Sequence, residues 1–434
     1  MPSATTKTTL DNGLTIILKE MHHAPVASFM VWYRVGSRNE IPGRTGVSHW
    51  LEHMMFKGTP KYPDGTLDRL VSREGGHWNA FTWLDFTAYY ETMPADRIDL
   101  ALDLEADRMK NTRFSAREVE AERQVILAER GMYENDPHFL LNEELTAAAF
   151  RVHPYHHEVI GDMADLQTMT RADLRDHYRR YYAPNNAIAV LVGDFDTAVI
   201  LPRLAELFGP IPVGKAAPAI TRQEPPQRGE RRIVVNGPGD APTLSAAYRA
   251  PAATHPDYFA LTLLNAAFAG GGSLGMFGGG GSNKSSRLYK ALVDTDLAVA
   301  AYGGLTPTID PYLYVITAVV NNGSVLAGHT LTAVEAALDA EIGRLAAEPI
   351  TQAELDKALK RAKAEFVMAG ESITGQAQLL GMAEAVTGDY RWFETVLEQL
   401  KAVTLTDIER VRATYLRKQA RTIGWYEPLE ASSE

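Results

Sequence analysis

A proline- and glycine-rich segment near the middle of the chain constrains the fold more than any other feature. Between Phe208 and Gly229 the sequence contains Gly-Pro-Ile-Pro-Val-Gly and, further on, Glu-Pro-Pro-Gln-Arg-Gly, a composition typical of an extended linker. The chain has 434 residues, too many for one ordinary core. We therefore expect a first domain over residues 1–215, a linker over 216–229 and a second domain over 230–434.

Both predicted domains begin with strands and continue into helices. Asp11-Asn12-Gly13 supplies the turn of a predicted hairpin over residues 9–20. The other predicted strands cover 26–35, 78–92, 187–193, 231–235 and 243–249, and the predicted helices cover 47–57, 97–109, 116–133 and 258–268. The repeated order indicates a weak internal repeat. The predicted fold class is α+β, with two related domains, each a mostly antiparallel sheet with helices packed on one face.

Composition excludes several kinds of chemistry. The chain has no cysteine, so disulfides and thiolate metal sites are excluded, and any metal site must use His, Asp and Glu. Its net charge of -11 and lack of basic stretches argue against nucleic acid as a partner. No apolar run reaches the roughly 18 residues of a membrane span, and the first residues lack the apolar region of a signal peptide. Cytoplasmic residence is the simplest expectation, with the periplasm as the alternative if a signal peptide has been removed.

One predicted helix carries a pattern of metal ligands. His49-Trp50-Leu51-Glu52-His53 places both imidazoles and the carboxylate on one face, because positions i, i+3 and i+4 of a helix are neighbours. Two neutral imidazoles suit Zn²⁺, and Glu52 could take a proton from a water beside the metal. A catalytic zinc needs a third protein ligand. Glu122 and Glu129 stand seven residues apart on one face of a predicted helix, and either could supply it.

Three segments resemble the pitrilysin family of zinc peptidases, the inverzincins, which includes insulysin and the mitochondrial processing peptidase. They are residues 46–59, with Gly-Val-Ser-His-Trp-Leu-Glu-His, residues 75–82, with Gly-Gly-His-Trp-Asn-Ala-Phe-Thr, and residues 122–129. The resemblance is to the branch with a two-domain subunit. It implies one zinc per chain, with Glu129 as the third ligand, Glu122 orienting a ligand histidine and Glu52 as general base.

The resemblance also implies a substrate and a partner. Asn79, Ala80 and Phe81 resemble the family's active-site edge strand, to which an extended peptide adds by main-chain hydrogen bonds. The expected function is a zinc-dependent endopeptidase that cuts unfolded peptides inside a chamber.

The Arg and Tyr with which many relatives grip the substrate are missing, because Val293 and Val299 or Ala300 hold the expected places. We therefore expect the catalytic subunit of a heterodimer, whose related zinc-free partner supplies the Arg/Tyr pair. The alternative is a non-catalytic structural or zinc-binding subunit of a larger complex.

Two further patterns are expected to be structural. The glycine-rich segment 270–281 lacks the Gly-Lys-Ser/Thr of a phosphate-binding loop, so we interpret it as a loop. His153, His156 and His157 lie in a segment containing Pro154 and lack helical spacing, so we expect no metal site there.

Overall fold

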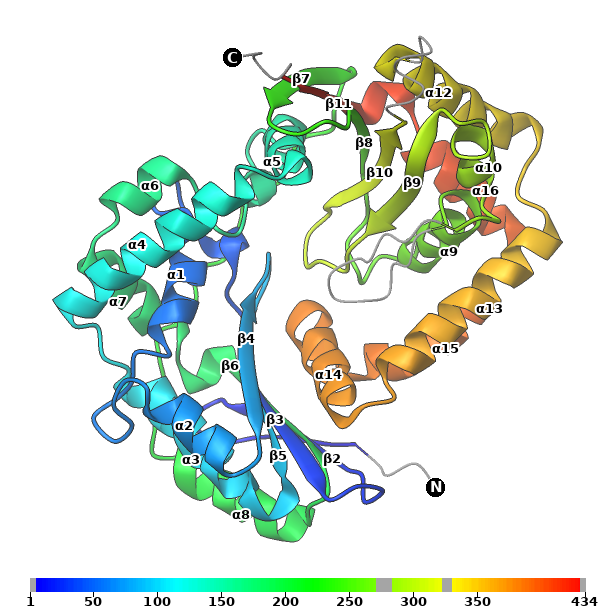
Figure 1. Ribbon diagram of the computed structural model, residues 1–434. Coiled ribbons are helices and arrows are strands. Elements are labelled where there is room, and N and C mark those ends of the chain that lie inside the picture. Colours follow the sequence, from blue (N-terminus) through cyan, green and yellow to red (C-terminus); the bar gives the residue numbers. More distant parts are fainter. Residues whose placement is uncertain (1–4, 271–282, 322–329, 430–434) are drawn as a thin grey trace. The chain divides into compact units, whose positions relative to one another are not determined.

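The computed structural model describes residues 5–270, 283–321 and 330–429, which form two compact units (Figure 1). Unit 1 comprises Met1–Arg130, His157–Thr221 and Ala369–Phe393, and unit 2 comprises Gly131–His156, Arg222–Met368 and Glu394–Glu434. One change of unit, at Thr221, falls inside the predicted linker. The predicted domain bounds themselves stay a prediction, and the predicted glycine-rich loop lies outside the described residues except for Gly270.

The sheet of unit 1 has six strands in the order β1-β2-β6-β3-β5-β4. Its strands are β1 (Thr6–Thr9), β2 (Thr15–Glu20), β3 (Val26–Tyr33), β4 (His77–Thr82), β5 (Thr87–Pro94) and β6 (Ala187–Gly193). Neighbouring strands are antiparallel except for β2 and β6, which are parallel. The central strands β3 and β6 are buried along nearly their whole length, as expected for strands covered on both faces.

Helices cover both faces of this sheet. They are α1 (Val47–Met54), α2 (Thr66–Arg73), α3 (Ile98–Asn111), α4 (Ala116–Tyr133), α6 (Met163–Thr168), α7 (Arg171–Tyr181), α8 (Thr197–Phe208) and α14 (Ile373–Thr387). Phe29 of β3 packs edge-on against Phe208 of α8. Trp32, on the opposite face of β3, meets α14 at Gly381, where a Cβ would lie 2.1 Å from the indole nitrogen.

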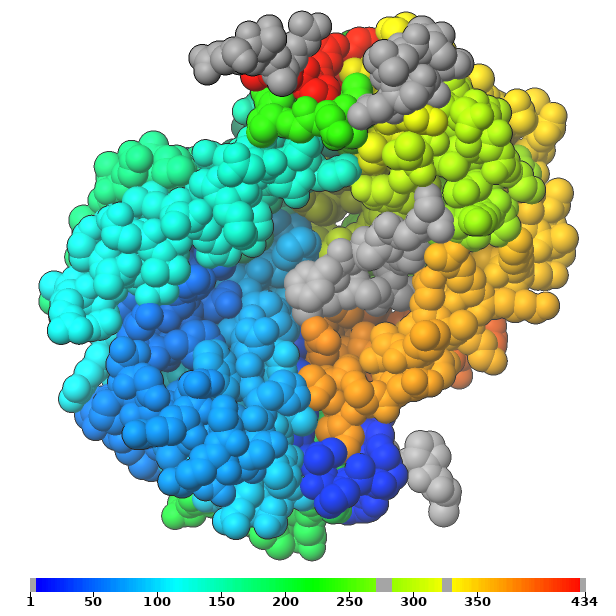
Figure 2. Space-filling model, in the orientation of Figure 1, coloured from blue at the N-terminus to red at the C-terminus, as the bar shows by residue number. Residues whose placement is uncertain are grey.

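Helix α14 is anchored to unit 1 by a buried carboxylate. Glu384 accepts hydrogen bonds from Lys7 Nζ at 2.7 Å and from Arg34 at 3.2 Å. Figure 2 shows the blue residues near the N-terminus against the orange segment around α14. A segment from the last quarter of the chain therefore completes the unit that the first residues begin.

The sheet of unit 2 has the order β7-β11-β8-β10-β9. Its strands are β7 (Arg231–Gly237), β8 (Thr243–Arg249), β9 (Ala298–Leu305), β10 (Leu313–Val320) and β11 (Arg421–Pro428). Strands β7 and β11 are parallel and the other neighbours are antiparallel. This is the order of β2-β6-β3-β5-β4 in unit 1, so the predicted fold class of two related α+β domains with mostly antiparallel sheets is confirmed. The sequence predicted helices packed on one face of each sheet, whereas in unit 1 α8 and α14 lie on opposite faces of β3.

Helix α5 (Pro137–Ala149) packs on β7, β8 and β11 of unit 2, much as α14 packs on β3 and β6 of unit 1. Gly424 of β11 allows the close approach, because a Cβ there would lie 2.8 Å from Leu141. The other α-helices of the described residues are α9 (Tyr258–Phe268), α10 (Arg287–Leu292), α12 (Leu331–Ala347), α13 (Gln352–Ala369), α15 (Arg391–Ala402) and α16 (Leu405–Tyr415). Short 3-10 helices are η1 (Ser37–Asn39), η2 (Ala95–Arg97), η3 (Pro154–His156), η4 (Pro184–Asn186) and η5 (Lys418–Ala420).

Most predicted elements are confirmed, and one is wrong. The hairpin at the N-terminus forms, with its first strand at Thr6–Thr9. The single strand predicted over 78–92 is instead the hairpin of β4 and β5. Its turn is closed by the N–H of Trp83, which donates to the carbonyl of Phe86 at 2.8 Å. The turn contains neither Gly nor Pro, so the strongest turn signals are missing from the sequence.

Candidate metal centre

Two helices of unit 1 bring three potential metal ligands together. His49 and His53 project from the same face of α1, with ring centroids 4.7 Å apart. Helix α4 places Glu129 opposite them, with Oε1 3.9 Å from His49 Nε2 and Oε2 3.7 Å from His53 Nε2. One ligand atom from each residue lies within 4.8 Å of the others.

This geometry fits a zinc ion. Bonds of about 2.0 to 2.2 Å in a tetrahedral site separate neighbouring ligand atoms by roughly 3.3 to 3.5 Å. The distances of 3.7 and 3.9 Å are to different oxygens of Glu129, and one ligand atom from each residue lies within 4.8 Å of the others, so side-chain movements of about an ångström bring the three to that spacing. Two histidines and one glutamate form a donor set of catalytic zinc sites, which keep a fourth position open for water.

Glu122 holds one of the two histidines. Its Oε1 lies 2.8 Å from Nδ1 of His53, and its Oε2 lies 2.6 Å from Nζ of Lys57. Burial opposes ionisation of Glu122, but its bonds to His53 and Lys57 outweigh burial and lower its pKa. The bond to Nδ1 leaves His53 Nε2 directed at Glu129, the arrangement in which a carboxylate orients a metal-binding imidazole.

The two histidines have different electrostatic environments. Burial, aided by the nearby His53, lowers the pKa of His49 to about 3, so its imidazole is neutral and able to bind a cation. Burial also disfavours the charged form of His53, but Glu122 and the neighbouring carboxylates outweigh it and raise the pKa.

Glu52 lies on α1 between the two histidines and is almost completely buried. Its Oε2 accepts a hydrogen bond of 2.6 Å from the Oγ1 of Thr82, at the end of β4. Burial raises the pKa of Glu52 to about 7 despite this bond. A carboxyl group with such a pKa can accept and release a proton near neutral pH. Thr82 lies in one of the segments that carry the resemblance, but the sequence did not assign it a role.

The three residues predicted to bind substrate lie on β4, which within the described sheet pairs with β5 alone and forms its edge. Asn79 is exposed, and Ala80 and Phe81 are half-buried. Phe81 packs edge-on against Trp32 at 5.4 Å between ring centroids. An edge strand offers main-chain groups to a further strand.

The histidines that were expected to be structural, in the segment around Pro154, make local contacts. Nε2 of His153 lies 3.1 Å from Asp310, and Glu224 accepts hydrogen bonds from the N–H groups of Arg151, Val152 and His153, all within unit 2. Nδ1 of His156 lies 3.0 Å from the carbonyl oxygen of His153. These contacts fix the loop that contains Pro154.

Comparison with known proteins shows the family. The family model described as Insulinase (Peptidase family M16) matches residues 15–163, and the model described as Peptidase M16 inactive domain matches residues 168–362. The chain belongs to peptidase family M16. Among the described residues, no helix is both long and apolar enough to cross a membrane.

Relatives and solved structures resemble nearly the whole chain. The zinc protease PqqE of Helicobacter pylori is 32% identical over 97% of this chain and 92% of its own length. The mitochondrial-processing peptidase subunit beta of Lentinula edodes is 26% identical over 94% of this chain and 86% of its own length. The crystal structure of a protease from Helicobacter pylori is 30% identical, with a TM-score of 0.91 over 99% of this chain and all of that one. The names of these relatives support a peptidase that uses zinc.

Proposed function

We propose that this chain is a zinc-dependent endopeptidase that binds one Zn²⁺ through His49, His53 and Glu129. The observation that carries the proposal is the convergence of these three side chains within 4.8 Å, beside a buried carboxylate on the same helix. When bound, zinc would polarise the scissile carbonyl and lower the pKa of a neighbouring water.

Three residues around the ligands have separate roles in the proposed reaction. Glu52 takes a proton from the attacking water while the oxygen of that water bonds to the carbonyl carbon. Glu52 then gives the proton to the amine nitrogen as the C–N bond breaks. Thr82 fixes the carboxylate of Glu52 through a 2.6 Å hydrogen bond. Glu122 keeps His53 in the orientation that binds the metal.

The proposed substrates are unfolded peptides, enclosed in a chamber during cleavage. Asn79, Ala80 and Phe81 lie on an edge strand, which would hold an extended peptide by its backbone and make binding depend little on side chains. Val293 directly follows α10, and Val299 and Ala300 lie on β9, so these positions supply no Arg or Tyr. A related zinc-free chain would then contribute that pair, as the proposed second subunit of a heterodimer. The naming of one relative as a subunit of a processing peptidase supports this proposal.

Three substitutions test the proposed enzyme. Glu52→Gln should retain zinc and lose peptide hydrolysis by about 10² to 10⁴-fold, because the general base is gone. Glu129→Gln should lose zinc, because it replaces an anionic ligand with a neutral amide. Glu120→Gln is the control, since this exposed residue of α4 pairs only with its neighbours Arg123 and Gln124 in the described contacts. Bound zinc is measured by elemental analysis, and cleavage with unfolded peptides.

The partner is tested by mixing. Hydrolysis by the zinc-loaded chain is measured alone and with a related zinc-free two-domain chain from the same genome, before and after chelation. Activity that appears only in the mixture and disappears with chelator is the expected result. Full activity of the chain alone would refute the divided active site. No cleavage in any mixture, despite bound zinc, would favour a structural or zinc-binding subunit.

A further inference from the structure

The helix that carries both histidines begins without a side-chain cap. Its N-cap residue is Gly46, which has a φ of 83° and no side chain to accept a hydrogen bond. A Cβ there would lie 2.2 Å from the carbonyl oxygen of Ile160, so glycine is required at this position. The first N–H groups of a helix have no partner within the helix. Since Val47 and Ser48 are buried, water cannot easily replace the missing cap.

A buried carboxylate from outside the helix takes the place of the cap. Oε2 of Glu40 accepts the N–H of Gly46 at 2.7 Å, and Oε1 accepts the N–H of Ser48 at 2.8 Å. Glu40 follows η1 and is 5% exposed. Burial raises the pKa of Glu40 to about 8, although the hydrogen bonds from Ser48 and Gly46 favour its ionised form. Its stabilising effect therefore comes from its two oxygens, which accept N–H groups that the helix itself leaves unpaired.

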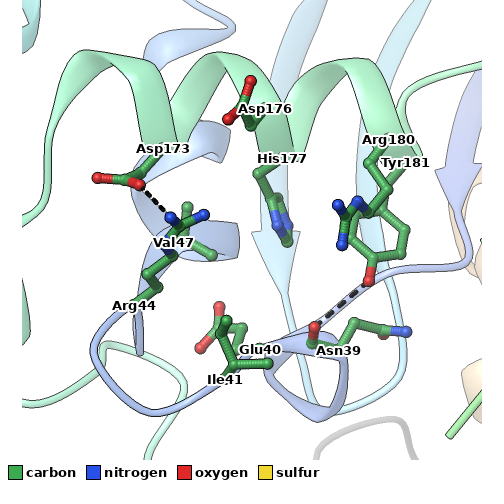
Figure 3. Close-up of a pocket in the computed structure, with 10 residues that line it drawn as sticks. All are labelled: Asn39, Glu40, Ile41, Arg44, Val47, Asp173, Asp176, His177, Arg180 and Tyr181. Carbon is green, nitrogen blue, oxygen red and sulfur yellow. Dashed lines mark hydrogen bonds and ion pairs between the residues drawn. The ribbon is translucent and has the colours of Figure 1, made fainter. Parts of the chain in front are cut away.

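Glu40 lines a small pocket between the start of α1 and helix α7. Figure 3 shows Glu40 and Val47 facing His177 of α7 across this pocket, whose volume is about 80 Å³. Nε2 of His177 lies 3.1 Å from the Oγ of Ser48, and Thr45 donates its N–H and its hydroxyl to Asp165. The first turn of α1 is therefore fastened to its neighbours through several polar contacts, of which Glu40 alone takes two helix N–H groups.

The two histidines are oriented by different means. Nδ1 of His53 is held by Glu122 at 2.8 Å. Nδ1 of His49 is buried and has no hydrogen-bond partner among the described residues. A metal-binding histidine usually depends on a partner at its other nitrogen for its orientation. The direction of the His49 ring therefore depends on the backbone of the first helical turn, and His49 directly follows Ser48, whose N–H is bound by Glu40.

We propose that Glu40 is a positioning residue for the metal centre, which aims His49 by fixing the first turn of α1. The inference rests on the proposed function only in taking His49 as a zinc ligand. Glu122 and Glu40 then play parallel parts: the first holds one ligand by its side chain, and the second holds the other through the backbone.

The test compares two buried carboxylates that differ in what they hold. Glu40→Gln keeps the shape of the side chain but sets an NH₂ group against one backbone N–H. Glu384→Gln is the matched control, because Glu384 is equally buried, also accepts a backbone N–H, from Tyr390 at 3.1 Å, and lies on α14. Zn²⁺ affinity is measured by competition with a chromophoric chelator, and the coordination geometry by the visible spectrum of the Co²⁺-substituted protein.

Glu40→Gln should weaken Zn²⁺ binding about tenfold and change the Co²⁺ spectrum. Glu384→Gln should lower the melting temperature but leave the Zn²⁺ affinity and the Co²⁺ spectrum unchanged. Glu40→Asp, which keeps the two carboxyl oxygens on a shorter side chain, should recover part of the affinity, and it replaces the Gln variant if that does not fold. Wild-type affinity and spectrum in the folded Glu40 variants would overturn the inference and leave the proposed function intact. A wild-type protein that binds no Zn²⁺ would instead overturn the metal centre itself.

Discussion

Replacing Gly381 with alanine should destabilise unit 1, although alanine is the better helix former. The new methyl group would lie 2.1 Å from the indole nitrogen of Trp32, whereas ordinary contacts begin at 3.4 Å. Trp32 is completely buried between the sheet and its helices, so the ring has no free space into which to move. Overpacking of this kind costs about 3 kcal/mol, and the gain in helix propensity returns about 1 kcal/mol. The free energy of unfolding should therefore fall by about 2 kcal/mol.

Gly343 provides the control. It lies inside α12 with nothing within 4 Å of a Cβ, so Gly343→Ala should raise stability by about 0.5 to 1 kcal/mol. Urea unfolding followed by tryptophan fluorescence is a suitable assay, because five of the six tryptophans lie in unit 1. Far-ultraviolet circular dichroism would follow unit 2 as well. If Gly381→Ala were as stable as the wild type, the close packing of α14 on β3 would be refuted.

Two further predictions concern charges. Arg108→Met should cost about 3 to 5 kcal/mol in the free energy of unfolding, because it leaves Glu91 and Glu105 buried without their cation; a loss below 1 kcal/mol in urea titration would contradict this. The hydrogen bond from Arg287 lowers the pKa of Glu354 to about 2. A lowered carboxyl pKa stabilises the fold above the unfolded pKa and loses that effect as pH falls through the folded value. Glu354→Gln should therefore cost about 1 kcal/mol at pH 7, after allowing for solvent screening, and almost nothing at pH 2. Equal losses at both values would show that charge is not responsible.

Local signals predicted most of the elements. Asp11-Asn12-Gly13 marked the first hairpin, and the periodicity over 116–133 matched α4 to the residue. The hairpin of β4 and β5 was missed because its turn contains neither Gly nor Pro, and Asp85 alone did not mark it. The docking of α14 on unit 1 could not be predicted from the sequence, because its partner strands β3 and β6 end at Tyr33 and Gly193, far before α14 begins at Ile373. An apolar helix also does not specify which sheet it covers.

At the site, too, local sequence patterns predicted some residues, whereas others depend on contacts between distant parts of the chain. Helical spacing put His49, Glu52 and His53 on one face, but the choice between Glu122 and Glu129 came from resemblance and not from spacing. The structure places Glu129 beside both histidines and Glu122 behind one of them. Their roles in binding remain a proposal. Glu40 was missed, although a glutamate shortly before a glycine-started helix could have suggested an external cap.

Each unit contains one helix that lies far along the chain from most of that unit, α14 in unit 1 and α5 in unit 2. This determines when each sheet can be covered during synthesis. The last strand of the first sheet ends at Gly193, but the helix that covers it is complete only at Thr387. A ribosome that adds about 5 to 20 residues per second needs roughly 10 to 40 s to cover that interval. During this time the nascent sheet has an uncovered apolar face that includes Trp32. We expect this face to be the part of the nascent chain that a holding chaperone binds.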